Sequence, residues 1–444
     1  MLAWLVKEVA SPYGDVATLH WAVPDTDDNA DVDALNSTAL QVKLESAEDQ
    51  LGAVLWNSNT AALNHLHTNI FVSSAVHADH HGARTDASST AAPLAGKNIV
   101  ELGAGVGCLG IALAMAGARV AITDLKELLP LMEHNARLND RRVQSRSGGA
   151  GRCVALQWKW GPTVSTGVHK QVQKACGGAR EPAPQQRLPI TDADAVDRVV
   201  SAMAASLLKP SASLAGCVEA LQPTAAATSA GAATTQCRFH YVILCDALYG
   251  NPKDWPALLY TLTELMATNP NECQVINFCE QRVSDVEGAF LALLDAENGK
   301  TYVQMDQRLE RGGDALWANV VESAMRCCRS ASSTSSAVEQ HALREEAANA
   351  LLSYVLVQRR GAYRWTYSTE VLQDAQSDLN MVIRATQIRW TRVVSNDGEA
   401  SPATSRHPRR PREHDDDDDD NVDGSAPDGT PAKRHRAGGR QHRC

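Results

Sequence analysis

The sequence predicts an α/β fold of the Rossmann-like kind, with a mostly parallel seven-stranded sheet and helices on both faces. Short apolar segments typical of strands alternate with longer segments whose apolar residues recur at helical spacing. A glycine-rich loop follows one strand and precedes a helix, and the next strand ends at Asp124. Strands and helices that alternate in this way are typical of parallel sheets covered on both sides.

The expected elements follow one another along most of the chain. Period-two alternation or short apolar runs predict strands at residues 40–44, 98–102, 119–123, 153–156, 241–245, 274–278 and 351–357. Helical spacing of apolar residues predicts helices at residues 58–66, 107–116, 125–138, 193–208, 256–267 and 283–295.

Composition predicts the domain organisation. An N-terminal extension covers residues 1–37, and one domain covers 38–393 with inserts at about 73–92, 161–237 and 311–350. Residues 223–235 are rich in Ala, Thr and Ser and are expected to be unfolded. Residues 394–444 form an expected disordered tail, with six aspartates at 415–420 between basic clusters at 406–410 and 433–436. The clusters suit either a nuclear import signal or a solvated tail.

The charge distribution restricts the kinds of partner. The formal net charge of −10 lies on residues 1–400, because the nine basic and nine acidic residues of 401–444 cancel. An acidic body makes a nucleic acid an unlikely main partner, since binding phosphates needs a basic face. It suits a basic substrate, such as a lysine-bearing protein.

The sequence also suggests where the protein works. We expect a soluble cytoplasmic protein without a membrane partner, because no apolar run of about 18 residues and no signal-peptide pattern is seen. The eleven cysteines lack a C-x-x-C pair, and Cys108, Cys245 and Cys279 resemble buried thiols, which suits a reducing compartment. The tail clusters add the nucleus as a second location. A monomer is favoured, although the sequence does not determine the oligomeric state.

The run V-E-L-G-A-G-V-G at residues 100–107 is the strongest motif. Glycines let the backbone approach a ligand, and the helix N-terminus offers free N–H groups. Asp124 can accept hydrogen bonds from both ribose hydroxyls of a nucleoside cofactor. The spacing Gly105-x-Gly107-x-x-Gly110 also matches the dinucleotide fingerprint, so a nicotinamide-dependent oxidoreductase is an alternative. In a dehydrogenase, however, the first glycine directly follows the strand, which is not the case here.

Histidines offer weaker signals. The run H-A-D-H-H at residues 77–81 could bind a metal, but a solvated loop is favoured and no metal site is predicted. His65 and His67 are expected on the surface of a helix rather than as ligands.

Further segments extend the pattern around the glycine loop. They are G-A-V-L-W at 52–56, H-N-A-R-L-N at 134–139, L-Q-W-K-W-G at 156–161 and D-A-L-Y at 246–249. Together with the loop, this ensemble resembles the seven-β-strand, or class I, protein-lysine methyltransferases that carry a D-x-x-Y motif. The resemblance covers roughly residues 38–139, 153–161 and 239–308, with the late strand at 351–357.

The resemblance implies S-adenosylmethionine as the cofactor. It implies that Gly103, Gly105 and Gly107 line the methionine end of the cofactor, with Glu101 beside them, and that Asp124 holds the ribose. Trp56 would pack near the cofactor from the N-terminal segment. Either Trp158 or Trp160 would pack against the adenine region. Trp160 is preferred because Gly161 follows it, as in the L-x-W-G pattern of the family.

The resemblance also implies an acceptor site. Asp246 and Tyr249 of the D-x-x-Y motif would face the target amine as catalytic residues, with Asp246 also beside the cofactor. Methyl transfer is an in-line displacement that depends mainly on alignment. The lysine must arrive neutral, although its free pKa is about 10.4, and a desolvated pocket favours the neutral form.

The expected function is therefore methylation of a lysine in a non-histone protein, such as a translation factor or chaperone. Other acceptors, such as protein arginine or histidine, remain alternatives. Adenine-N6 methylation is disfavoured, because Ala247 and Leu248 stand where that chemistry usually shows two prolines. A non-catalytic interaction protein on the same fold is a further alternative, against which the carboxylates Asp124 and Asp246 argue.

Overall fold

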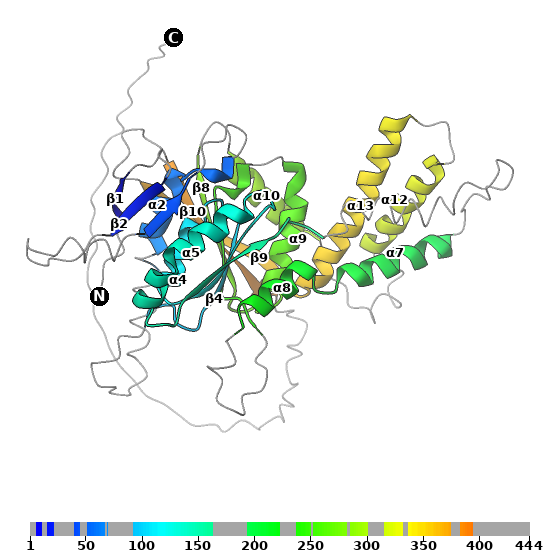
Figure 1. Cartoon of the computed structure of the whole chain (residues 1–444). Helices are drawn as coiled ribbons and strands as arrows, with labels where there is room; N and C mark the ends of the chain where they lie inside the picture. The colour runs from blue at the N-terminus through cyan, green and yellow to red at the C-terminus, as the bar shows by residue number, and fades with distance from the viewer. Residues whose placement is uncertain are drawn as a thin grey trace, which may run out of the picture. The chain divides into compact units, whose positions relative to one another are not determined.

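The computed structural model describes residues 6–10, 16–21, 40–44, 51–66, 69, 92–162, 193–222, 237–249, 252–281, 285–300, 315–331, 336–373 and 382–393. All of them belong to one compact unit, Met1–Val394 (Figure 1). The histidine run at 77–81, the Ala/Thr/Ser-rich run at 223–235 and the charged tail lie outside the described residues. The predictions made for those segments therefore stay predictions.

Seven strands form the central sheet, in the order β6-β5-β4-β7-β8-β10-β9. Five of them pair in parallel: β4 (Asn98–Leu102), β5 (Arg119–Asp124), β6 (Arg152–Gln157), β7 (Tyr241–Cys245) and β8 (Gln274–Glu280). The last two, β9 (Tyr363–Gln373) and β10 (Val382–Arg392), form an antiparallel hairpin that joins the sheet through β8. The predicted fold class is thereby confirmed.

The strand order reverses between β4 and β7. From β4 the chain moves outward through β5 to β6, then crosses back to add β7 and β8 on the other side of β4. In open α/β sheets, ligands bind outside the carboxyl ends of the strands at such a switch point. The segments that follow β4, β5 and β7 are therefore the place to look for a site.

Helices cover both faces of the sheet. The face of Ile99 packs against α2 (Asn57–Leu66), α4 (Cys108–Met115) and α5 (Leu129–Arg146). The face of Val100 and Leu102 packs against helices that include α8 (Ala212–Ala220), α9 (Trp255–Met266) and α10 (Val286–Asn298). Successive residues of a strand point to opposite faces, so the fully buried β4 serves both cores. The helix α5 begins four residues later than expected, with a proline in its first turn, where a missing N–H does no harm.

A separate three-stranded antiparallel sheet precedes the central one. It consists of β1 (Val6–Ala10), β2 (Val16–Trp21) and β3 (Leu40–Lys43), in that order. Only β3 matches a strand predicted from the sequence. The short 3₁₀ helix η1 (Leu51–Ala53) and α2 follow it along the chain and lead toward the glycine loop.

The expected strand at 351–357 is wrong. These residues lie in the helix α13 (Ala337–Arg360), which starts with a capping box formed by Ser336 and Glu339. A continuous apolar run of this length suits a buried helix as well as a strand, and the upstream cap decides for the helix. The last two strands of the sheet are instead β9 and β10, which period and composition did not reveal.

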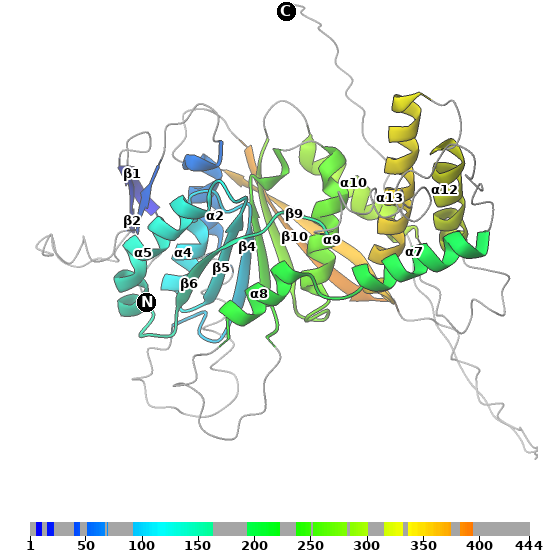
Figure 2. The ribbon, with the colours of Figure 1, turned by 45° about the vertical axis from the view of Figure 1, so that its right-hand side comes forward.

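Helices also occupy both long inserts. The insert at 161–237 contains the expected helix, α7 (Ala193–Leu207), and an additional one, α8. The insert at 311–350 contains α12 (Ala315–Ala331) and the first half of α13. The helices α7, α12 and α13 contact one another, and Figures 1 and 2 show them side by side, away from α4 and α5.

One stretch, Ala193–Ala220, is long and apolar enough to cross a membrane by those two criteria alone. It is divided into α7 and α8 by the turn that precedes Ser211, the N-cap of α8. Residues of α7 at helical spacing, among them Val196, Val200 and Leu207, are buried in the core. One side of α7 thus belongs to the core.

The cysteines and one histidine differ in how far they match the sequence-based expectations. Cys108, Cys245 and Cys279 are free and buried, as expected, whereas Cys328 is disulfide-bonded. His65 was expected at the surface, which is wrong: it is buried and packs edge-on against Phe278 of β8. The helical pattern of α2 does not show that the central sheet covers its histidine. His67 lies outside the described residues.

Candidate active site

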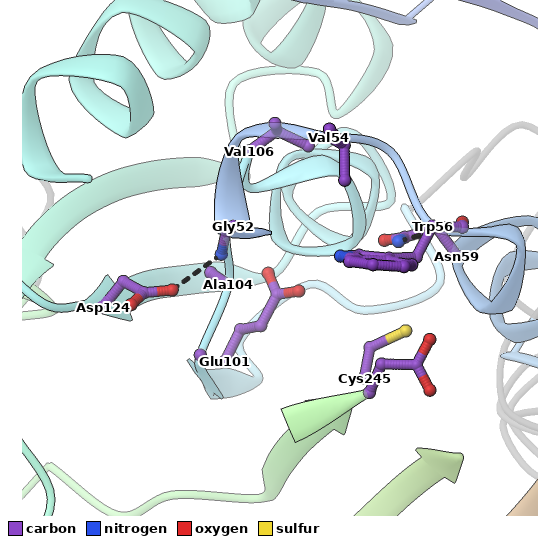
Figure 3. A pocket seen from close by; sticks show the side chains of 12 residues that line it. Gly52, Val54, Trp56, Asn59, Glu101, Ala104, Val106, Asp124 and Cys245 are labelled. Atoms are coloured by element: carbon purple, nitrogen blue, oxygen red, sulfur yellow. Dashed lines mark hydrogen bonds between the residues drawn. The ribbon is translucent and has the colours of Figure 1, made fainter. Parts of the chain in front are cut away.

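A cavity of about 220 Å³ opens at the switch point of the sheet. It lies where β4, β5 and β7 end, and the segment before α2 closes it from above (Figure 3). The residues that line it are Gly52, Val54, Trp56, Asn59, Glu101, Gly103, Ala104, Gly105, Val106, Asp124, Cys245 and Asp246. Most of the residues predicted for the cofactor therefore meet in one place.

The glycine loop needs its glycines for steric reasons. Gly103, Gly105 and Gly107 all have positive φ angles, of 69°, 55° and 78°, which other residues rarely adopt. A Cβ atom on Gly105 would lie 2.6 Å from the carbonyl oxygen of Gly52. The loop and the N-terminal segment can therefore approach each other only because this side chain is missing.

Gly110, the third glycine of the dinucleotide-like spacing, does not face the cavity. A Cβ atom there would lie 2.2 Å from Ile122 of β5, so the glycine permits close packing of α4 on the sheet. Its N–H donates to Oε2 of Glu101 at 2.8 Å. The spacing is thus explained by helix packing, without a pyrophosphate.

Two carboxyl groups hold the loop from below. Glu101 is 1% exposed, and burial raises its pKa to about 8. Asp124 accepts the N–H of Gly105 at 2.9 Å through Oδ2 and that of Leu125 at 2.7 Å through Oδ1. Burial also raises the pKa of Asp124, while these two N–H groups act in the opposite direction. In Figure 3, Glu101 lies between Asp124 on one side and Trp56 and Cys245 on the other.

Asp246 lies just beyond β7 in an unusual backbone conformation. Its φ angle is 49°, and among the described residues other than glycine it is the one with a positive φ. The residue is 8% exposed. Oδ1 accepts the N–H of Glu280 at 2.8 Å, and Oδ2 accepts the hydroxyl of Ser58 at 2.6 Å. A residue held in a sparsely populated conformation at a cavity wall is a candidate for function.

The other half of the D-x-x-Y motif is less well defined. The backbone of Tyr249 ends the short 3₁₀ helix η5 (Ala247–Tyr249), directly after Asp246. Its side chain lies outside the described residues. That the ring faces the target amine stays a prediction.

The three tryptophans predicted at the cofactor lie in different surroundings. Trp56 lines the cavity. Neither of the other two lines the cavity: Trp158 is 2% exposed and belongs to the core on the opposite face, and Trp160 packs against that same core. Trp160 borders the glycine loop, since a Cβ atom on Gly103 would lie 3.3 Å from its ring. This arrangement favours Trp160 over Trp158, although the contact with adenine stays a prediction.

Six lining residues are not among the predicted site residues: Gly52, Val54, Asn59, Ala104, Val106 and Cys245. The first three come from the segment around Trp56, and the others lie in the glycine loop and at the end of β7. Ser58, which contacts Asp246, is not predicted either. No local signal marks Ser58, because its partner lies 188 positions away in the sequence.

The donor set fits a cationic nucleoside cofactor. Within the described part of the chain, the lining carries three carboxyl groups, those of Glu101, Asp124 and Asp246, and no Lys, Arg or His. A carboxylate offers about four lone-pair positions, so Asp124 retains capacity for ribose hydroxyls beyond its two backbone contacts. The described residues include no group of three or more His, Cys, Asp or Glu placed to hold a metal ion.

Part of the chain is similar to known proteins. Residues 34–169 match a family model described as "Lysine methyltransferase". The protein-lysine methyltransferase METTL21E of Bos taurus is 30% identical over 118 residues, which are 27% of this chain and 33% of that protein. EEF1A lysine methyltransferase 3 of Mus musculus is 41% identical over 63 residues, 14% of this chain and 25% of that protein.

The resemblance to protein-lysine methyltransferases is confirmed over residues 34–169. The family match implies S-adenosylmethionine as the cofactor. The chain also resembles a solved S-adenosylmethionine-dependent methyltransferase from Methanosarcina mazei, with a TM-score of 0.24 and 10% identity, over 66% of this chain and 92% of that one.

The match has limits that matter for the site. The chain spans a quarter to a third of the length of these curated relatives. The matched segment contains the glycine loop, Asp124 and both tryptophans after β6, but it ends before Asp246 and Tyr249. The cofactor half of the site thus has family support, whereas the acceptor half rests on geometry and on the motif.

Proposed function

We propose that this chain is an S-adenosylmethionine-dependent methyltransferase that methylates a lysine side chain of a non-histone protein. The observation that carries the proposal is the cavity at the switch point. It is bounded by the glycine loop, lined by three carboxyl groups and free of cationic lining residues within the described chain. The lysine methyltransferase match over the cofactor half supports the choice of acceptor.

Each carboxyl group has a distinct part in the proposed reaction. Bound S-adenosylmethionine supplies an electrophilic methyl group on a sulfonium sulfur. Asp124 accepts the ribose hydroxyls, while its contact with Gly105 keeps the loop closed against the cofactor. Glu101 lies in the same cavity as a counter-charge when ionised. Trp56 forms an aromatic wall that excludes water from the reacting groups.

Asp246 orients the amine. When bound, the cofactor would supply the methyl carbon to the nitrogen lone pair, and the electron pair of the broken carbon–sulfur bond would stay on sulfur. The incoming ammonium must first lose one proton to solvent, which a desolvated pocket favours. The Asp246 carboxylate then accepts a hydrogen bond from the amine and aligns the lone pair with the methyl group, which is where most of the rate gain arises.

The proposed substrate is a protein with an exposed lysine, of the translation-factor or chaperone kind. One relative is named for a lysine methyltransferase reaction on EEF1A, and the acidic body of this chain suits a basic partner. We propose a cytoplasmic location, and the basic clusters of the tail support nuclear import in addition. We propose a monomer that acts without membrane or nucleic acid.

The test compares Asp246→Ala with wild type in single-turnover methyl transfer. With labelled S-adenosylmethionine, the labelled protein in a cell extract is identified first and then purified as substrate. Loss of an aligned transition-state contact predicts a rate lower by roughly a hundredfold, with cofactor affinity within a few-fold. Asp295→Ala on α10, whose carboxylate accepts the hydroxyl of Tyr367, is the matched control and should retain the wild-type rate.

Tyr249→Phe should slow transfer less than Tyr249→Ala, since the ring is proposed to shape the lysine channel. A near-normal rate of methyl transfer in Asp246→Ala would contradict the assignment of Asp246 to the acceptor site. If the label is found on arginine or histidine, that residue replaces lysine as the proposed acceptor. Tighter binding of NAD than of S-adenosylmethionine would replace the methyltransferase by an oxidoreductase.

A further inference from the structure

Ser58 lies at the start of α2, 188 positions from Asp246, and its side chain is fully buried. Its hydroxyl donates to Oδ2 of Asp246 at 2.6 Å. We infer that Ser58 is a positioning residue, which fixes the Asp246 carboxylate in the orientation that receives the acceptor amine. This inference rests on the proposed function, because it assigns a task to Asp246.

The carboxylate is held from two sides. On the β8 side, Oδ1 accepts the N–H of Glu280, and the backbone N–H of Asp246 donates to the carbonyl of Phe278 at 2.8 Å. On the α2 side, the described contact is the hydroxyl of Ser58. The two oxygens are thus bound to different elements, so the carboxylate plane cannot rotate without breaking one contact.

The direction of the Ser58 hydrogen bond is determined by its neighbours. The thiol of Cys245, 3.2 Å away, donates to the hydroxyl oxygen of Ser58. Burial raises the pKa of Cys245 well above its ordinary value, so the thiol keeps its proton. A hydroxyl has one proton to donate, and an ionised carboxylate only accepts. The chain therefore runs from Cys245 through Ser58 to Asp246, and such chains strengthen their members.

The position of Ser58 also links the two halves of the site. Trp56 and Asn59, on either side of it in the sequence, line the cofactor cavity. The backbone N–H and the side-chain amide of Asn59 both donate to the carbonyl of Trp56, which stiffens this first turn of α2. One rigid turn thus forms part of the cofactor wall and orients the acceptor carboxylate.

A purely structural role for Ser58 is the competing explanation. In that case Ser58→Ala would lower stability alone, and its effect would be independent of Asp246. A positioning role predicts that the effect passes through the carboxylate. The two explanations are separated by a double-mutant cycle, which isolates the coupling between two residues in contact.

The experiment uses the full-length chain and three variants: Ser58→Ala, Asp246→Ala and the double variant. Ser58→Ala should slow single-turnover transfer about tenfold, keep S-adenosylmethionine affinity within threefold, and have no further effect in the Asp246→Ala background. Ser58→Cys, which retains a weaker donor, should give an intermediate rate. Ser323→Ala, a buried serine of α12, is the matched control and should leave the rate unchanged.

Urea unfolding of the wild type, Ser58→Ala, Asp246→Ala and the double variant gives a readout independent of activity. The effect of Ser58→Ala on the unfolding equilibrium constant should be at least fivefold smaller when Asp246 is already alanine. If the cycle shows coupling in unfolding and Asp246→Ala slows transfer, but Ser58→Ala does not, the positioning role is overturned and the proposed function stands. If Asp246→Ala leaves the rate unchanged, the acceptor assignment fails and the inference with it. Additive effects in unfolding would show that Ser58 and Asp246 are not energetically coupled, and the positioning role would then be overturned.

Discussion

The two faces of the central sheet are built differently. The face covered by α2, α4 and α5 contains buried polar side chains that connect segments far apart in the sequence, and the cavity opens there. The face covered by α9, α10 and α13 is a larger apolar core in which helices of both long inserts take part. The comparison indicates that one face holds the site together, whereas the other anchors the inserts.

On the first face, two asparagine side chains of α5 form hydrogen bonds with the backbone of β3, as a neighbouring strand would. Asn139 accepts the N–H of Gln41 at 3.1 Å and also donates to its carbonyl. Asn135 accepts the N–H of Lys43 at 2.7 Å and donates to the carbonyls of Lys43 and, at 2.9 Å, Val106. Spaced four apart, they lie on one side of the helix. They attach the N-terminal sheet to α5, and Asn135 also contacts the glycine loop.

On the second face, Arg359 connects the insert at 161–237 to the core. Arg359 of α13 donates to the carbonyls of Leu207 and Lys209, at the end of α7, and pairs with Glu264 of α9 at 3.3 Å. Its guanidinium also lies over the ring of Tyr260, 4.3 Å from the centroid. Both charged side chains are nearly buried, at 7% and 3% exposure. None of these contacts reaches the cavity lining.

The largest expected effect is that of Arg359→Ala. The substitution leaves Glu264 buried without its cation, which typically costs about 3–5 kcal/mol of folding free energy. Because the contact lies on the face away from the cavity, cofactor affinity should stay within twofold in the folded protein. Urea unfolding measures the first quantity and calorimetry the second.

The control is Arg326→Ala, whose pair with Glu346 is about half exposed and should contribute less than about 1 kcal/mol. A strong loss of cofactor affinity in folded Arg359→Ala would show that the two faces are coupled. The separation of roles would then be wrong.

Asn135→Ala should have the next largest effect. It removes three hydrogen bonds, to the N–H and carbonyl of Lys43 and to the carbonyl of Val106, and each such bond contributes about 0.5–1.5 kcal/mol. We expect a loss of about 2–3 kcal/mol in stability, together with weaker cofactor binding because the glycine loop loses a support.

Asn139→Ala is the matched comparison, since it contacts β3 and α5 but not the loop. It should lower stability while keeping cofactor affinity near the wild-type value. Equal losses of affinity in both variants would mean that docking of the N-terminal sheet, rather than the loop contact, controls the cavity.

The sequence predicts the local motifs of the site better than the contacts between residues that lie far apart in the chain. The glycine loop and Asp124 could be found because strand, loop and helix are consecutive, so one short motif contains the signal. The asparagines of α5 were noticed as part of a motif, but their partners on β3 are over ninety positions away. The link between Ser58 and Asp246 is of the same kind. Such pairs follow from the path of the chain, which local patterns do not contain.

The error at 351–357 has a different origin. The run L-L-S-Y-V-L-V is apolar and partly β-branched, so its period fits a strand and a buried helix equally well. What decides is the capping box at Ser336, fifteen residues upstream, and the contacts of α13 with α9 and α12. Trp158 shows a related limit, because its place in the core on the opposite face depends on packing rather than on the L-x-W-G pattern.

The smallest expected effect concerns Glu101, the buried acid on the site face. Burial raises its pKa to about 8, so below that pH it is mainly protonated in the free protein. A cationic cofactor in the same cavity favours the ionised form, and binding must therefore release a proton at lower pH. Cofactor affinity should rise with pH up to about 8, by at most tenfold per pH unit, and level off above it.

The measurement is calorimetric titration with S-adenosylmethionine between pH 6 and 9. Glu101→Gln provides the control, since its amide oxygen can still accept the N–H of Gly110 but no longer titrates. This variant should bind more weakly at pH 8.5 and show a flatter pH profile. S-adenosylhomocysteine, which lacks the sulfonium charge, should depend less on pH than S-adenosylmethionine in the wild type. A wild-type profile as flat as that of Glu101→Gln would show that the acid does not respond to the charge of the cofactor. Glu101 would then serve only to hold α4 against the loop through Gly110.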